Sequence, residues 1–181
     1  MFPIKIYSLR IVPLNPIYNE IVALKRMFIE TFGNQKFSKS IPHITLATFE
    51  MDYGYQEFLL KAFNQLSNMK QFQLEINGFD VFENKTEVLF LKLAENEIIN
   101  QILQNLKILW IRDLHRKYSS LNIPNLLHMT ISNAKGKEML YKSLDLFQEI
   151  DYYRQIQVNK LTLVSRYEGK TWDWEHHINL S

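Results

Sequence analysis

The sequence IPHITL, at residues 41–46, carries a His-x-Thr pattern that returns later in the chain as LHMTI, at residues 127–131. In an extended strand, successive side chains point to opposite faces. The histidine and threonine of each copy therefore share one face, and the apolar residues share the other. Two strands that each present an imidazole and a hydroxyl, in matching halves of a chain, predict a symmetric acid-base site around one phosphate group.

The segments around the two copies repeat the same order of elements. A polar loop precedes each motif, at residues 34–40 and 117–126, and a helix follows each motif strand. In chain order, the hydrophobic periodicity and the turn residues predict a strand at 5–12, a helix at 17–33, the first motif strand at 43–51, a helix at 55–69, strands at 72–82 and 88–93, a helix at 95–114, the second motif strand, a helix at 136–150, and strands at 156–167 and 171–180.

This duplication of architecture predicts an α+β fold. We expect two pseudo-symmetric lobes of antiparallel sheet, with helices packed outside and a central cleft that carries both His-x-Thr motifs. Residues 1–181 would form a single domain, with lobes at approximately 1–90 and 91–181 whose strands can be exchanged between the lobes.

Composition narrows the class of protein. The chain has 181 residues, of which 46% are hydrophobic and 22% charged, and this is typical of a globular protein with a real core. It has no apolar run of ~18 residues and no secretion signal, so we expect a cytoplasmic protein that does not enter a membrane. The absence of cysteine excludes thiolate nucleophiles and thiolate metal sites. A net charge of +2 suits a small anionic ligand or a nucleic-acid end better than a long duplex.

The two motifs, HITL at residues 43–46 and HMTI at residues 128–131, resemble those of the 2H phosphoesterase superfamily, which includes the 2′-5′ RNA ligases and the 2′,3′-cyclic nucleotide phosphodiesterases. The likeness extends over the length and the element order of the whole chain. Pro42 gives the first copy the family's usual Pro-His-x-Thr form, whereas Leu127 stands where proline is frequent in the second copy.

The resemblance implies that His43 and His128 act as general acid and general base on a phosphodiester. It also implies that Thr45 and Thr130 hydrogen-bond the phosphate oxygens. Elementary chemistry favours the same role for the histidines, because imidazole has an ordinary pKa of ~6.5 and can take or give a proton at neutral pH. Which histidine is the acid stays open, since the pair is nearly symmetric.

The implied function is a metal-independent phosphodiesterase or RNA ligase-like enzyme. It would act on 2′,3′-cyclic phosphate or 2′-5′ phosphodiester linkages, with an RNA terminus or a small nucleotide as substrate. No cofactor is expected, and the protein is expected to be a monomer. Ligation, hydrolysis and cleavage of a cyclic oligonucleotide stay open.

Further substrate contacts are weaker hypotheses. Lys36 and Lys39 lie in the loop before the first motif, and Arg166 lies near the terminal turn, so each could meet phosphate. Tyr167 could stack on a base. A solvated surface role is the alternative for each of the charged residues.

The remaining tryptophans and histidines have alternative interpretations. Trp172 and Trp174 could stack on a base, but they share a strand face with apolar residues, and we expect them to pack in the core. His176 and His177 are adjacent on a strand and so point to opposite faces, which is poor geometry for shared metal ligation. His115 is expected in a solvated helix tail.

Two functions other than catalysis stay open. A nucleotide- or RNA-end-binding module could keep the same pocket without turnover, and an adaptor could present a bound RNA terminus to another protein. Retention of both histidines and both threonines favours an enzyme, because phosphate binding alone would tolerate Asn or Gln in place of histidine.

Overall fold

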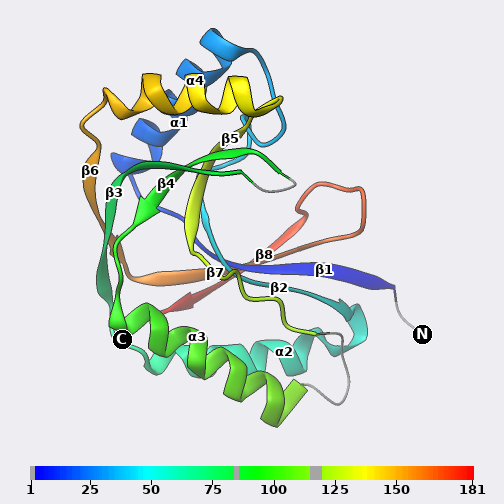
Figure 1. Cartoon of the computed structure of the whole chain (residues 1–181). Coiled ribbons are helices and arrows are strands. Elements are labelled where there is room, and N and C mark those ends of the chain that lie inside the picture. The colour runs from blue at the N-terminus through cyan, green and yellow to red at the C-terminus, as the bar shows by residue number, and fades with distance from the viewer. Residues whose placement is uncertain (1–2, 84–85, 115–119) are drawn as a thin grey trace.

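The computed structural model describes residues 3–83, 86–114 and 120–181, which form an antiparallel sheet covered by helices (Figure 1). In chain order the elements are β1 (Ile4–Ile11), α1 (Ile17–Phe32), β2 (Ile44–Asp52), the 3₁₀ turn η1 (Tyr53–Tyr55), α2 (Gln56–Phe63), the 3₁₀ turn η2 (Asn64–Asn68), β3 (Phe72–Phe82), β4 (Val88–Leu93), α3 (Glu97–Leu109), the π-helical turn η3 (Trp110–Leu114), β5 (His128–Asn133), α4 (Lys137–Gln148), β6 (Tyr153–Val158), β7 (Lys160–Arg166) and β8 (Trp174–Asn179).

The two motif strands lie at the centre of the sheet. Among the described residues the strand order is β6-β3-β4-β5-β2-β1-β7-β8. β5 forms a ladder with β4, and β2 forms a ladder with β1, but β2 and β5 meet through a single described pair, Ile44 with Met129. The two halves of the sheet therefore join at the motifs and diverge away from them, which curls the sheet.

The helices cover the two halves of the sheet in pairs. α1 and α4 lie together over the half that contains β5, whereas α2 and α3 lie over the half that contains β2 (Figure 1). Phe147 of α4 packs in the first group, with its ring 6.3 Å from that of Phe28 in α1 and 5.2 Å from that of Phe79 in β3. Each helix that precedes a motif strand thus packs on the other half of the sheet.

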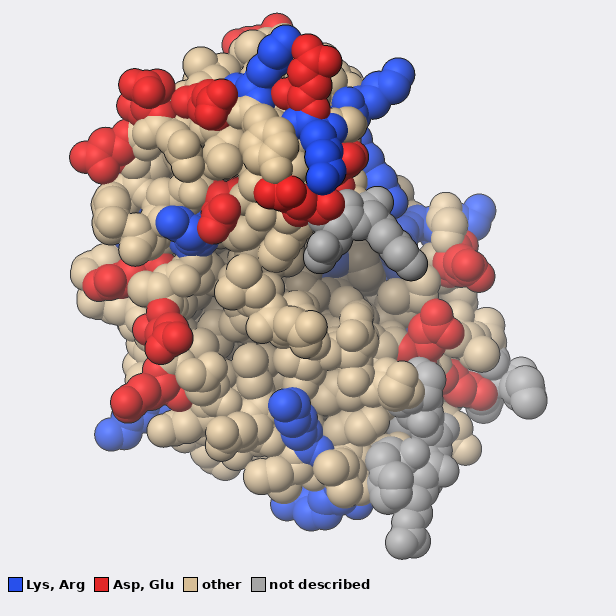
Figure 2. Space-filling view, viewed as in Figure 1, with Lys and Arg blue, Asp and Glu red and all other residues tan. Residues whose placement is uncertain are grey.

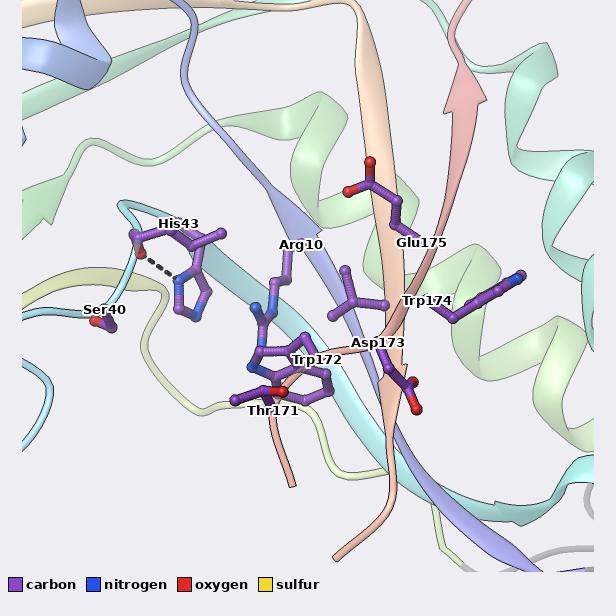
Figure 3. Close-up of a pocket in the computed structure, with 10 residues that line it drawn as sticks. Arg10, Ser40, His43, Thr171, Trp172, Asp173, Trp174 and Glu175 are labelled. Carbon is purple, nitrogen blue, oxygen red and sulfur yellow. Dashed lines mark hydrogen bonds between the residues drawn. The ribbon is translucent and has the colours of Figure 1, made fainter. Parts of the chain in front are cut away.

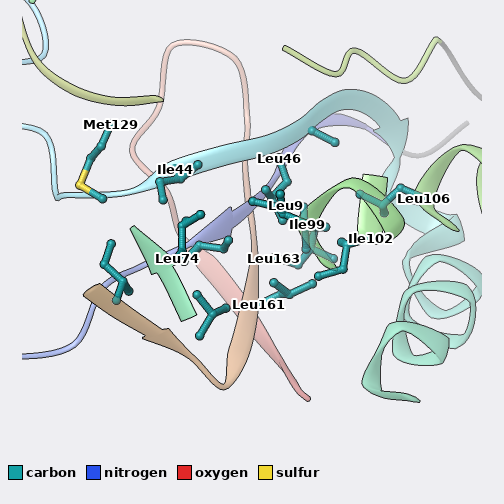
Figure 4. Close-up of a cluster of buried hydrophobic side chains, with 14 of the residues drawn as sticks. Leu9, Ile44, Leu46, Leu74, Ile99, Ile102, Leu106, Met129, Leu161 and Leu163 are labelled. Carbon is teal, nitrogen blue, oxygen red and sulfur yellow. The ribbon is translucent and has the colours of Figure 1, made fainter. Parts of the chain in front are cut away.

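The packing of α3 shows how the sequence produces this arrangement. Asn96 caps the helix, because its Oδ1 accepts hydrogen bonds from the backbone N–H groups of Ile98 and Ile99 at 3.0 and 3.1 Å. An apolar stripe follows at helical spacing and faces the sheet. Figure 4 shows the stripe residues of α3 beside apolar side chains of β1, β2 and β7; the labelled residues are Ile99, Ile102, Leu106, Leu9, Leu46 and Leu163.

The prediction of an α+β fold with antiparallel strands is confirmed, but three element boundaries are wrong. The predicted strand at 156–167 is two strands, since β6 pairs with β3 whereas β7 pairs with β1, and Asn159 lies between them. The last strand begins at Trp174 rather than at Thr171, and the predicted helix at 55–69 is α2 between two 3₁₀ turns. Within the described residues, no helix is long and apolar enough to cross a bilayer.

Candidate active site

The two motif histidines make the same hydrogen bond to the backbone. Nδ1 of His43 lies 2.8 Å from the carbonyl oxygen of Ile41, and Nδ1 of His128 lies 2.9 Å from the carbonyl oxygen of Leu126. A carbonyl oxygen can only accept, so Nδ1 of each ring carries the hydrogen and donates it. Nε2 of each imidazole then holds the lone pair, which can take a proton or, once protonated, give one.

The pairing of Ile44 with Met129 determines which face carries the polar motif residues. Both apolar side chains are fully buried, and they point into the core below the crossing of β2 and β5. Because side chains alternate along a strand, Thr45 of β2 and His128 and Thr130 of β5 lie on the opposite face of the sheet. His43 directly precedes β2 and is half-buried at the cavity described below. The crossing thus brings the two motifs to one surface.

The four polar motif residues are chain neighbours of the one pair at which the two strands meet. The described register between β2 and β5 is Ile44 with Met129. His43 and Thr45 flank Ile44 in the sequence, and His128 and Thr130 flank Met129. The crossing therefore fixes the backbone of both motifs at one place in the sheet.

His128 lies among aromatic rings. Its ring centre is 4.8 Å from that of Phe82 and 5.2 Å from that of Phe90, and both contacts are edge-to-face. Burial among these rings lowers the pKa of His128, and the hydrogen bond to the Leu126 carbonyl opposes this effect.

His43 lies among positive charges. Its pKa is lowered to about 4, firstly by burial and then by the charge of Arg10, with smaller effects from Lys25 and His128. The hydrogen bond to the Ile41 carbonyl acts in the opposite direction.

A cavity of about 560 Å³ opens beside His43 (Figure 3). This volume is in the range of small-molecule sites. Its lining comes from β1, the loop before the first motif, β7 and the segment that enters β8: Arg10, Ser40, Ile41, His43, Val164, Thr171, Trp172, Asp173, Trp174 and Glu175. Figure 2 shows acidic and basic side chains gathered mainly around the α1 and α4 end of one face, with uncharged residues over much of the rest.

Arg10 is a site residue that sequence reasoning missed. It is 4% exposed, pairs with Thr45 across β1 and β2, and donates from Nε to Oγ of Ser8 at 2.9 Å. Burial and the charge of Arg166 lower the pKa of Arg10 to about 10. The signal in the sequence was a charged residue inside the apolar strand. Arg10 comes two residues after Ser8, so the two side chains share one face of the strand.

Lys25 of α1 is a second missed residue. Its buried ammonium group donates to the carbonyl oxygen of Phe37 at 3.1 Å, to Oγ of Ser40 at 3.3 Å and to the carbonyl oxygen of Ile131 at 2.9 Å. Burial lowers its pKa to about 8. Lys25 therefore ties the loop before the first motif to the strand of the second motif.

The structure separates the weaker lysine candidates from the cavity. Nζ of Lys36 lies 4.9 Å from the ring centre of Phe37, and Lys39 lines a different depression beside α1. In the described part of the chain, neither lysine lines the cavity beside His43. Tyr167 directly follows β7, and Nζ of Lys5 is 4.7 Å from its ring centre.

Trp172 corrects the prediction of a core tryptophan. It is 37% exposed, precedes β8 and lines the cavity, where the guanidinium carbon of Arg10 is 4.0 Å and that of Arg166 4.8 Å from its ring. A strand that begins only at Trp174 does not impose the predicted alternation on Trp172. Trp174 is half-buried and packs against the core, with its ring 6.5 Å from that of Tyr7.

The remaining histidines lie away from the crossing or outside the description. Nε2 of His176 is 2.9 Å from Oδ1 of Asn64, whereas Nδ1 of His177 is 3.3 Å from Oγ1 of Thr162, so the two rings have separate partners. His115 lies outside the described residues. Within the ranges that the structure describes, no group of three or more His, Asp or Glu side chains could hold a metal ion.

Solved structures share this fold at low sequence identity. TT0787 of Thermus thermophilus matches with a TM-score of 0.68 at 16% identity, over 97% of this chain and 98% of that chain. LigT of E. coli, in complex with 3′-AMP, matches with a TM-score of 0.62 at 14% identity, over 99% and 96%. Usb1 of Kluyveromyces marxianus matches with a TM-score of 0.51 at 13% identity, over 97% and 98%.

Sequence comparison identifies the family directly. No curated protein matches the chain. The family model of the 2′-5′ RNA ligase superfamily matches residues 13–170, which include both His-x-Thr motifs. This match covers most of the chain and agrees with the motif resemblance to the 2H phosphoesterases. The chain therefore belongs to the 2′-5′ RNA ligase superfamily.

Proposed function

We propose that this chain is a metal-independent phosphodiesterase or RNA ligase-like enzyme. Its substrate would carry a 2′,3′-cyclic phosphate or a 2′-5′ phosphodiester linkage, at an RNA terminus or in a small nucleotide. One observation carries the proposal: two histidines with the same backbone hydrogen bond, at Nδ1, lie on one face of the crossing of β2 and β5. Family membership supports a phosphoesterase or ligase chemistry at this place.

The different surroundings of the two histidines support different roles. Positive charges near His43 favour its neutral form, which can accept a proton, so we assign it as the general base. The pKa of His128 is lowered by burial rather than by cations, so an incoming phosphate anion can restore its protonated form more readily. We assign His128 as the general acid.

These roles define the steps of cyclic phosphate hydrolysis. Nε2 of His43 takes a proton from water while the water oxygen forms a bond to phosphorus. The bond from phosphorus to one ribose oxygen breaks, and protonated Nε2 of His128 gives its proton to that oxygen. The hydroxyl groups of Thr45 and Thr130 donate to the non-bridging phosphate oxygens. A 5′-hydroxyl in place of water would give ligation, and the reverse reaction exchanges the two histidine roles.

A non-catalytic nucleotide- or RNA-end-binding module is the second candidate. The observation in its favour is that the pKa of both histidines is lowered, so both rings are largely neutral near pH 7 before a ligand binds. A general acid needs its proton at the moment of reaction. Binding of phosphate between the rings would raise both pKa values, and only an enzyme would then turn its ligand over.

A panel of substrates tests the proposal. Metal-free protein would be incubated with 2′,3′-cyclic nucleotides, 2′-5′-linked oligonucleotides and cyclic dinucleotides, and the products identified by chromatography and mass. We expect turnover of at least one of the first two classes, with loss of turnover in His43→Ala. Binding of these compounds with no product from any of them would favour the binding module.

A further inference from the structure

Two guanidinium groups lie on the ring of Trp172, which lines the cavity beside His43 together with Arg10. Arg166 is not among the residues that line this cavity in the described part of the chain, and it reaches the site through its contact with Trp172. The guanidinium carbon of Arg10 is 4.0 Å from the centre of the Trp172 ring, and that of Arg166 is 4.8 Å from it. Figure 3 shows the Arg10 guanidinium over this ring and next to His43. Stacking on an aromatic face holds a guanidinium in place and leaves its edge free to donate hydrogen bonds.

The side-chain hydrogen bonds of these arginines leave donors unused. Nε of Arg10 donates to Oγ of Ser8, and Nη1 of Arg166 donates to the carbonyl oxygen of Lys170 at 3.0 Å. Nε of Arg166 is buried and has no hydrogen-bond partner among the residues that the structure describes. A guanidinium carries five donors, so both side chains keep capacity for an anion.

The carboxylates of the cavity have other partners. Asp173 lies 3.2 Å from Nζ of Lys5, and Glu175 lies 3.8 Å from Nε2 of His177. In the described residues, neither guanidinium pairs with a carboxylate. Burying a positive charge without a counter-charge is costly, and the nearby second arginine adds repulsion. A bound anion would therefore supply a partner that neither guanidinium has among the described carboxylates.

The two arginines lie at different distances from the position proposed for the reacting phosphate. Arg10 is the register partner of Thr45, so it lies beside the position of the reacting phosphate. Arg166 pairs with Ile6, four residues from Arg10 along β1, which is roughly 13 Å of strand. Both guanidiniums nevertheless lie against the same ring of Trp172, so the pair is held together at the edge of the cavity.

We propose that Arg166 and Arg10, held by Trp172, form a subsite for a second phosphate of the substrate. The preferred substrate would then carry a 5′-phosphate or an internucleotide phosphate in addition to the phosphate that reacts between the histidines. This inference rests on the proposed function, because it places the second phosphate relative to the reacting one. The planar donor edge of arginine suits the paired oxygens of a phosphate.

Kinetics with matched substrates test the subsite. The substrates are adenosine 2′,3′-cyclic phosphate, its 5′-phosphorylated form, and a dinucleotide that ends in a 2′,3′-cyclic phosphate. In the unmodified protein, we expect the second phosphate to raise kcat/KM roughly ten- to a hundredfold. The 5′-phosphorylated mononucleotide and the dinucleotide distinguish a terminal phosphate from an internucleotide one.

Variants of Arg166 connect the preference to this residue. Arg166→Gln should bring the ratio of kcat/KM for the phosphorylated substrate to kcat/KM for the unphosphorylated one close to one. Arg166→Lys should give an intermediate ratio, because lysine keeps the positive charge but lacks the planar donor edge. Lys170→Gln is the matched control: it removes an exposed positive charge from the same turn and should keep the ratio. Equal kcat/KM for all substrates in the unmodified protein, or an equal loss on all of them in Arg166→Gln, would overturn the proposal.

A binding measurement separates this inference from the proposed function. Calorimetry would compare adenosine 3′-monophosphate with adenosine 3′,5′-bisphosphate in the unmodified protein and in Arg166→Lys, with thermal melts to confirm that the variant folds. Tighter binding of the bisphosphate that weakens in Arg166→Lys supports the subsite even if no substrate is turned over. Equal affinity for both ligands contradicts the subsite even if cyclic phosphates are hydrolysed.

Discussion

The pH dependence of kcat/KM can distinguish the two histidines, because their surroundings differ. In the free protein the pKa of His43 is about 4, and that of His128 lies below its ordinary value. In the proposed mechanism, the active form has neutral His43 and protonated His128. We therefore expect a bell with an acid limb near pH 4, where His43 becomes protonated, and an alkaline limb below ~6.5, where His128 loses its proton. The ordinary imidazole pKa alone would place both limbs between about pH 5 and 8.

Two variants should each move one limb. The charge of Arg10 lowers the pKa of His43, so Arg10→Gln should move the acid limb to higher pH and leave the alkaline limb in place. The full lowering from 6.5 to about 4 corresponds to about 3 kcal/mol, and Arg10→Gln recovers only part of it because burial is the larger cause. Phe82→Ala should instead expose His128 and move the alkaline limb to higher pH.

The assay is the initial rate on a 2′,3′-cyclic nucleotide at constant ionic strength, over the pH range in which the fold persists. Nuclear magnetic resonance of the imidazole protons would measure both pKa values without turnover. If both limbs move together in either variant, or if Arg10→Gln moves the alkaline limb alone, the assignment of His43 as base and His128 as acid is wrong.

Three further predictions concern the rest of the site. Thr45→Ala or Thr130→Ala should lower kcat without moving either limb of the pH profile. The reason is that a hydroxyl donor stabilises phosphate charge but does not titrate in this pH range. A displaced limb would contradict this role. Lys25→Met should lower the free energy of unfolding by about 1–3 kcal/mol, because the carbonyl groups of Phe37 and Ile131 lose a buried hydrogen-bond donor. Denaturant titrations would measure this loss, and unchanged stability would show that the contact is dispensable. Activity should survive a metal chelator, since the histidines supply both proton transfers; loss in chelator with recovery on adding one metal would contradict the mechanism.

The local patterns in the sequence predicted the strands of the site but not their partners. Alternation in HITL and HMTI indicates which side chains share a face, and this is a property of each strand alone. The division of residues 156–167 into β6 and β7 depends on hydrogen-bond partners that lie far away in the chain. Asn159 carries no strong turn signal, so the sequence pattern continues across it.

Arg10 and Lys25 were missed for a related reason. Arg10 lies in a predicted strand and comes beside Thr45 only when β1 pairs with β2. Lys25 lies in a predicted helix and reaches Ile131 of β5 only when α1 packs on the sheet. The interpretation of Trp172 failed because it assumed that β8 begins earlier than Trp174. The sequence thus offered the candidate residues within each motif, whereas residues that tertiary packing brings beside them could not be found from it.

The most direct test of the paired-histidine mechanism is a double-mutant cycle on kcat for a 2′,3′-cyclic phosphate. His43→Ala and His128→Ala should each lower kcat roughly 10²- to 10⁴-fold, since each removes one proton transfer. The double variant should lose little more than either single variant, because the two rings act as a unit. His176→Ala, outside the cavity, is the matched control and should keep its rate. Near-normal turnover in a single variant, or losses that simply multiply in the double variant, would contradict the mechanism.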